Sequence, residues 1–69
     1  MNVKLVNKII TEAVEEFNKE EDLRYGQCIF NAAFNNCDLD TQEIVNMGID
    51  CFYDDGNVEA FIQYIGENF

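Results

Sequence analysis

The stretch VKLVNKIITEAVEEFNKE (residues 3–20) decides the fold class of this chain. Its apolar residues recur three and four positions apart, which places them on one stripe of a helix. Asn2 precedes this stretch and can cap the helix, and Glu15 and Lys19 form a favourable pair one turn apart. The sequence therefore predicts an amphipathic helix over residues 3–20. The apolar stripe consists of Val3, Leu5, Val6, Ile9, Ile10, Ala13, Val14 and Phe17.

The next apolar segment predicts a second helix over residues 23–35, with Asp22 as its cap. Its apolar residues cover a wide arc, so we expect this helix to lie at the centre of the fold. Gly26 falls in the first turn, where glycine costs about 1 kcal/mol relative to alanine. Close approach of another backbone segment would explain why glycine stands there.

The polar stretch around residues 35–37 separates this helix from a third one. Asp40 and Glu43 have the spacing of a helix start, which predicts a short helix over residues 41–47. Gly48 follows it, where a left-handed residue is expected to end the helix.

The last third of the chain contains a turn and a final helix. Residues 50–54 predict a turn of 3₁₀ type, and residues 56–57 predict a break in the chain. A last helix is expected over residues 58–66, ended by Gly66. We therefore predict an all-α fold, a compact small bundle of about four helices, two long and two short, with no sheet, in a single domain covering residues 1–69.

Cysteine and histidine usage restricts the chemistry and the compartment. The chain has no histidine, and Cys28, Cys37 and Cys51 form no C-x-x-C pair, so neither a metal site nor a cofactor is expected. The odd number of cysteines and an N-terminal segment unlike a signal peptide predict free thiols in a reducing cytoplasm, that of a bacterial or phage-infected cell. No stretch is apolar enough to predict a membrane span.

The charge of the chain is strongly asymmetric. Fourteen acidic residues oppose four basic ones, giving a formal net charge of −10. The four basic residues all lie within residues 4–24, so the rest of the chain has no cation. This field predicts no direct contact with nucleic acid or an anionic membrane, and it favours a protein partner with a basic surface. Mutual repulsion of the acids also predicts that added salt stabilises the fold.

No catalytic arrangement stands out, and we expect the protein not to be an enzyme. Cys51 lies at a predicted turn start, but Asp50 beside it would keep its thiol protonated. The acidic segment 38–43 lacks the glycine that a calcium loop needs at its sixth position, and segment 54–57 is too short to surround an ion. An enzyme that uses only carboxylates is the weakest of the functional options.

The predicted second helix has a group of polar residues at helical spacing. Arg24, Gln27 and Asn31 follow helical spacing and are expected to project from one side. In one interpretation they form a polar recognition site. In the other, which we favour, they are a hydrophilic face on which Arg24 binds a carboxylate of segment 50–55.

The segments RYGQCIFN (24–31) and DCFYDD (50–55) resemble a group of small bacteriophage and prophage proteins. Those proteins have an R-x-G-Q-x-x-x-N helix, then a D-x-F-Y turn, then a terminal helix containing Phe. The resemblance covers about residues 24–62 and implies an origin in a phage or mobile element, while it leaves the mechanism open. The group has proline at the position of Cys51, so the turn is expected to be looser here.

Two classes of function remain. The first is a non-catalytic protein–protein interaction module that modulates a partner protein. The second is a DNA mimic, which would inhibit a nucleic-acid-binding enzyme by presenting carboxylates in place of phosphates. The short chain also leaves a homodimer open. The candidate interaction residues are Arg24, Gln27, Asn31, Phe52, Tyr53, Asp54 and Asp55.

Overall fold

The computed structural model describes residues 1–20 and 22–69, and within these residues it has helices and no strand. The α-helices are α1 (Val3–Lys19), α2 (Tyr25–Asn36), α3 (Thr41–Asn46) and α4 (Val58–Asn68). A 3₁₀ helix, η1 (Asp55–Asn57), leads directly into α4. The predicted all-α bundle of four helices is confirmed. It measures 29 × 24 × 18 Å along its principal axes.

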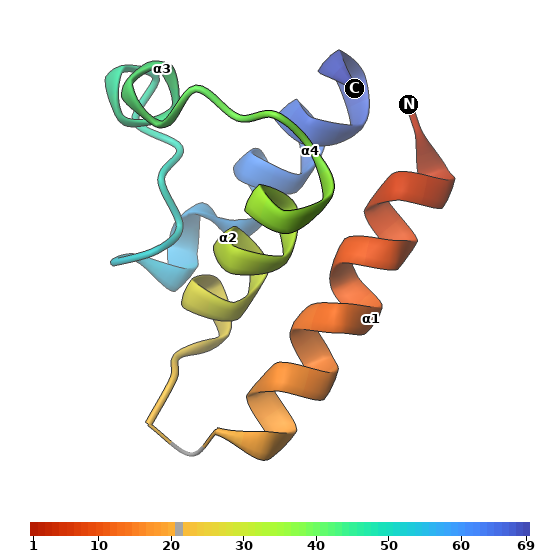
Figure 1. The fold of residues 1–69 in the computed structure, drawn as a ribbon. Helices are drawn as coiled ribbons and strands as arrows, with labels where there is room; N and C mark the ends of the chain where they lie inside the picture. Colours follow the sequence, from red (N-terminus) through yellow and green to blue (C-terminus); the bar gives the residue numbers. More distant parts are fainter. Residues whose placement is uncertain (21) are drawn as a thin grey trace.

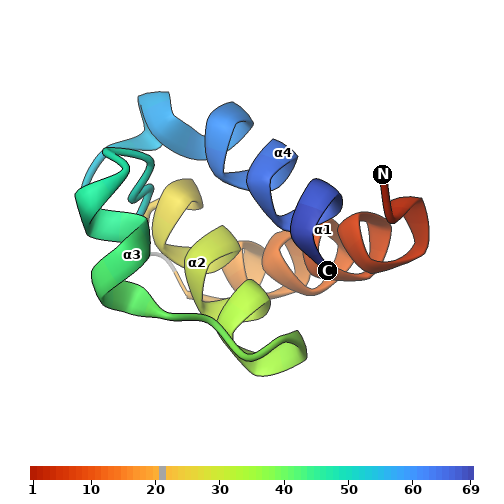
Figure 2. The ribbon, with the colours of Figure 1, turned by 90° about the horizontal axis from the view of Figure 1, so that it is seen from above.

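Helix α2 lies at the centre of the bundle, as its wide apolar arc predicts. Figure 1 shows α1 on one side of α2 and α4 behind it, while α3 lies on the side away from α1. Seen from above, α2 and α4 lie side by side across α1 (Figure 2). The two ends of the chain are adjacent, because the backbone N–H of Asn2 donates to the carbonyl oxygen of Gly66 at 2.7 Å.

The core is formed by the apolar stripes of all four helices. Each large side chain of this kind that leaves water contributes about 1.5–3 kcal/mol of transfer free energy. On α2, Phe30 stacks on Phe61 of α4 with ring centroids 5.5 Å apart. The fully buried side chains are Ile9 and Ala13 of α1, Ile29 and Ala33 of α2, Ile44 of α3, Cys51, and Phe61 and Ile65 of α4.

Helix ends follow local capping chemistry where the sequence supplies it. Asn2 accepts a hydrogen bond from the backbone N–H of Leu5, and Asp40 accepts from Gln42 and Glu43. Gly48 has φ +72°, the left-handed conformation expected after α3. These three predictions are confirmed.

The predicted start of α2 and the position of the 3₁₀ turn are wrong. Helix α2 begins at Tyr25, and Arg24 rather than Asp22 is its N-cap residue. The 3₁₀ helix covers residues 55–57 instead of 50–54, because Asp54 caps it by accepting from the backbone N–H of Gly56. Residues 56–57 lie inside η1, which continues directly into α4, so the predicted break at these residues is also wrong.

The prediction that Gly66 ends the last helix is also wrong, since α4 continues to Asn68. Gly66 is buried, and its carbonyl oxygen accepts from the backbone N–H of Asn2. A Cβ atom placed on it would lie 2.6 Å from Cγ of Met1 and 3.1 Å from a methyl group of Val6. Glycine here serves helix packing and not helix termination.

Candidate functional site

The sequence-predicted candidate residues meet where the start of α2 packs against residues 50–57. We call this contact the α2–turn junction and define it by Arg24, Gly26, Cys51, Phe52 and Asp55. It joins segments that lie 25 to 29 residues apart in the sequence.

Gly26 is the centre of the junction. A Cβ atom on this residue would overlap the carbonyl oxygen of Cys51 and would lie 2.6 Å from Oδ1 of Asp55. The backbone N–H of Gly26 donates to the same Oδ1 at 2.9 Å. Asp55 thus caps α2 from a distant part of the chain, and the expected close approach of another backbone segment is confirmed.

Cys51 strengthens the junction from the other side. Its buried thiol donates to the carbonyl oxygen of Gly26 at 3.2 Å. Burial, followed by the nearby charges of Asp50 and Asp55, raises the pKa of this thiol to about 12, despite opposing backbone hydrogen bonds. The sequence did not predict this hydrogen bond. It ties the turn to α2 at the position where a cysteine in place of proline is expected to loosen the turn.

Arg24 reaches the turn, but it does not bind a carboxylate there. Its Nη2 donates to the carbonyl oxygen of Phe52 at 3.4 Å, so the predicted contact with an aspartate is wrong. The aspartates of this segment accept hydrogen bonds from nearby backbone N–H groups. Asp50 accepts from the N–H of Phe52 at 2.8 Å, and Asp54 accepts from that of Gly56 at 2.9 Å.

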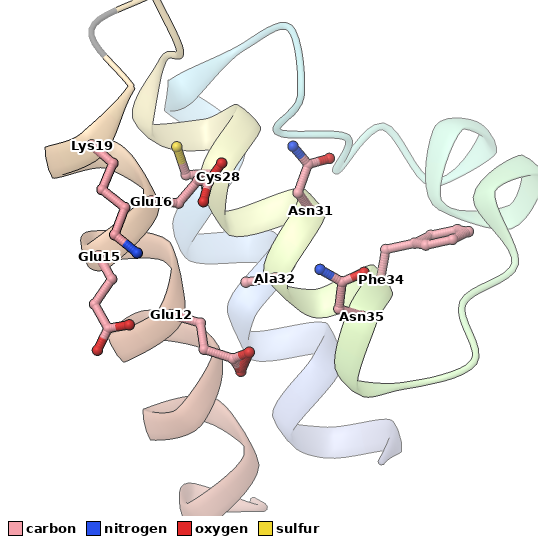
Figure 3. Close-up of a pocket in the computed structure, with 9 residues that line it drawn as sticks. All are labelled: Glu12, Glu15, Glu16, Lys19, Cys28, Asn31, Ala32, Phe34 and Asn35. Atoms are coloured by element: carbon pink, nitrogen blue, oxygen red, sulfur yellow. The ribbon is translucent and has the colours of Figure 1, made fainter.

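The side chains of Arg24, Gln27 and Asn31 have different surroundings in the structure. Gln27 turns back toward the start of α2, where its Oε1 accepts from the backbone N–H of Arg24 at 3.4 Å. Asn31 is exposed and lines a groove between α1 and α2, on the flank of α2 shown in Figure 3. The structure favours the interpretation in which Arg24 and Gln27 stabilise the fold.

The aromatic residues of the turn differ in exposure. Phe52 is half-buried and packs edge-on against Phe30, with ring centroids 5.6 Å apart. Tyr53 packs on Phe52 at 4.8 Å, yet 76% of its surface is exposed. Among the large hydrophobic residues described as exposed, Tyr53 has the largest exposed fraction. Asp54 and Asp55 are exposed beside it, although each also accepts a backbone hydrogen bond.

None of the three cysteines is activated. Burial raises the pKa values of the Cys28 and Cys37 thiols, and neighbouring carboxylates raise them further. The structure records all three cysteines as free. Within residues 1–20 and 22–69, no group of three or more Cys, Asp or Glu side chains is arranged to hold a metal ion.

Comparisons of the chain with protein-family models, with curated proteins and with solved structures find no match. Among the helices that the structure describes, none is long and apolar enough to cross a membrane.

Proposed function

We propose that this protein is a non-catalytic interaction module that binds a partner protein with a basic surface. The observation that supports it best is Tyr53, an aromatic side chain 76% exposed on a turn held by hydrogen bonds. Tyrosine is enriched among the residues that dominate binding energy at protein interfaces. An anchor on a fixed turn also loses little conformational entropy when it binds.

The charge of the chain supports a basic partner. The formal net charge is −10, and Asp54 and Asp55 lie next to Tyr53. A negative field of this kind accelerates encounters with a positive surface and disfavours acidic partners. The resemblance to phage and prophage proteins would place that partner in the cytoplasm of a bacterial or phage-infected cell.

The state of the cysteines supports a non-catalytic role. A cysteine nucleophile reacts as the thiolate, and a raised pKa keeps the thiol protonated at neutral pH. All three cysteines have raised pKa values, and the chain has no histidine to act as a base.

The DNA-mimic alternative has less support. A mimic needs carboxylates that face outward in a continuous ridge. Asp40, Asp54 and Asp55 are exposed, but together with Asp50 each accepts a hydrogen bond from a backbone N–H group, which fixes these carboxylates separately at helix starts and turns.

Affinity capture with a matched pair of variants tests the proposal. Immobilised wild type, Tyr53→Ala and Phe69→Ala proteins are exposed to bacterial lysate at low and high salt, and captured proteins are quantified by mass spectrometry. Phe69 is the control because it is an exposed aromatic at the opposite end of α4. We expect one protein that wild type and Phe69→Ala retain and that Tyr53→Ala loses by about tenfold or more, as for an interface hot spot.

Two results would contradict the proposal. Equal capture by all three proteins would remove Tyr53 from the interface. Capture of nucleic-acid-binding proteins alone, lost steeply as salt rises, would favour the DNA mimic instead.

A further inference from the structure

A groove of about 430 Å³ lies between α1 and α2, outside the α2–turn junction (Figure 3). Its floor consists of small side chains, those of Cys28 and Ala32, both buried on α2. The groove exists because these small residues leave space between the longer side chains on the outer flanks of the two helices.

The wall on α1 is acidic. Glu12, Glu15 and Glu16 line the groove from α1; Figure 3 shows Glu12 and Glu16 directed toward α2, while Glu15 lies farther from α2, near Lys19. Glu12 is half-buried and its Oε2 accepts from the side chain of Asn36 at 2.7 Å, so it holds α1 to α2. Glu15 and Glu16 are exposed and are available to a ligand. Figure 3 shows Glu16 pointing across the groove toward Cys28.

The opposite wall is neutral, and it consists of two asparagines and the exposed side chain of Phe34. Asn31 and Asn35 are exposed one helical turn apart on α2, and their carboxamide oxygens are hydrogen-bond acceptors. Among the described residues that line the groove, Lys19 is the one cation, and it lies at the C-terminal end of α1. Three glutamates against one lysine leave this groove with an acidic balance.

The floor of the groove experiences this negative charge. After burial, the charge of Glu16 is the largest cause that raises the pKa of the Cys28 thiol, and Asp55 and Glu20 add to it. An apolar floor beneath acidic and amide walls suits a long cationic side chain, whose methylene stem can pack on the floor. A guanidinium fits better than an ammonium, because its planar array of N–H donors can reach several oxygen acceptors at once.

We propose that the groove between α1 and α2 binds an arginine side chain on an exposed segment of the basic partner protein. This inference rests on the proposed function and assigns it a second contact surface. Nucleic acid is a poor occupant because its phosphates would meet the glutamates. A second copy of this chain is also disfavoured, because both copies have a net charge of −10.

Titration with synthetic peptides, followed by NMR of the ¹⁵N-labelled protein, tests this proposal. The probe is a peptide of alternating arginine and alanine with blocked termini, so that only its side chains are charged. A lysine–alanine peptide of equal length is the comparison. We expect saturable amide shifts concentrated in residues 12–19 and 28–35, and tighter binding of the arginine peptide.

Two double variants separate the groove from general charge attraction. Glu15→Gln with Glu16→Gln neutralises two groove carboxylates, and Glu59→Gln with Glu67→Gln makes the same charge change on exposed residues of α4. The first pair is expected to lower the affinity for the arginine peptide about threefold to tenfold, the effect expected from the loss of two exposed ion pairs. The second pair is expected to change affinity by less than about twofold, because distant exposed charges are screened.

Equal weakening by both pairs, or equal affinity for the two peptides, would overturn the groove as an arginine site. Shifts at the same amides when the protein is concentrated without peptide would make a second copy the occupant and would also overturn it. Shifts centred on Tyr53 would overturn the groove while leaving the interaction module intact. Failure of the proposed function has a different signature, namely that Tyr53→Ala leaves partner capture unchanged.

Discussion

Replacing Gly26 by alanine tests whether the α2–turn junction holds the fold together. The added methyl group would overlap the carbonyl oxygen of Cys51 and press on Asp55, so the turn has to move away from α2. Movement lengthens the hydrogen bond from Gly26 to Asp55, whose loss costs about 1 kcal/mol as for other helix caps. Overpacking against a backbone atom costs a further 1–3 kcal/mol or so.

Helix propensity opposes these costs, because alanine is favoured over glycine by about 1 kcal/mol. The net expectation for Gly26→Ala is a loss of about 1–3 kcal/mol in the free energy of unfolding, taking the three contributions together. In a domain of this size that loss lowers the melting temperature by roughly 4–24 °C. Urea denaturation and thermal melting followed by far-UV circular dichroism measure both quantities.

Gly66→Ala is the matched control, because Gly66 is also a buried helical glycine. The atoms nearest its added methyl group belong to the side chain of Met1, which is 68% exposed and can move aside. We expect Gly66→Ala to stay within about 1 kcal/mol of wild type, since the propensity gain offsets a small displacement. A Gly26→Ala protein as stable as wild type, or more stable than Gly66→Ala, would refute the close backbone contact.

Two further predictions concern pH and salt. The Cys51 thiol has a pKa of about 12 in the folded protein against an ordinary value of 9.0, so the unfolded chain ionises first as pH rises. Its contribution to stability is complete below pH 9 and is lost as pH rises toward 12, so Cys51→Ala should show a shallower alkaline decline in urea titrations. If the free energy of unfolding of the two proteins fell equally steeply with pH, the Cys51 thiol would have the same pKa in the folded and unfolded chain. Separately, added salt at pH 7 should raise the melting temperature. The fourteen acidic residues outnumber the four basic ones, so repulsion between the acids exceeds attraction to the bases, and salt screens that repulsion. A melting temperature that ignores salt would show that the acids are largely compensated by local hydrogen bonds.

Local patterns in the sequence are sufficient to predict where the helices lie. Helical periodicity identifies α1 within one residue at its C-terminal end, because an amphipathic stripe has to face the core wherever that core lies. Asn2, Asp40 and Gly48 were correctly placed for the same reason, since capping depends on groups within a few residues.

Errors arose where a distant segment replaces local chemistry. Residue type favours Asp22 as the cap of α2, whereas the N-cap residue is Arg24 and the distant Asp55 accepts from the backbone N–H of Gly26 in the first turn. Glycine commonly ends a helix, which predicts that role for Gly66, whereas in the fold Gly66 leaves space for the side chain of Met1. Charge alone pairs Arg24 with an aspartate, whereas in the fold its guanidinium donates to the carbonyl oxygen of Phe52 and the aspartates accept from backbone N–H groups.

The sequence by itself determined the fold class, the net charge of −10 and the identity of the candidate side chains. Only the tertiary structure decided that Gly26 and Cys51 meet, that Tyr53 remains exposed, and that α1 and α2 enclose an acidic groove. The physical reason is the distance along the sequence over which each kind of interaction acts. Helix formation and capping act over three or four residues, whereas the junction and the groove depend on how helices pack, which joins residues that no local pattern relates.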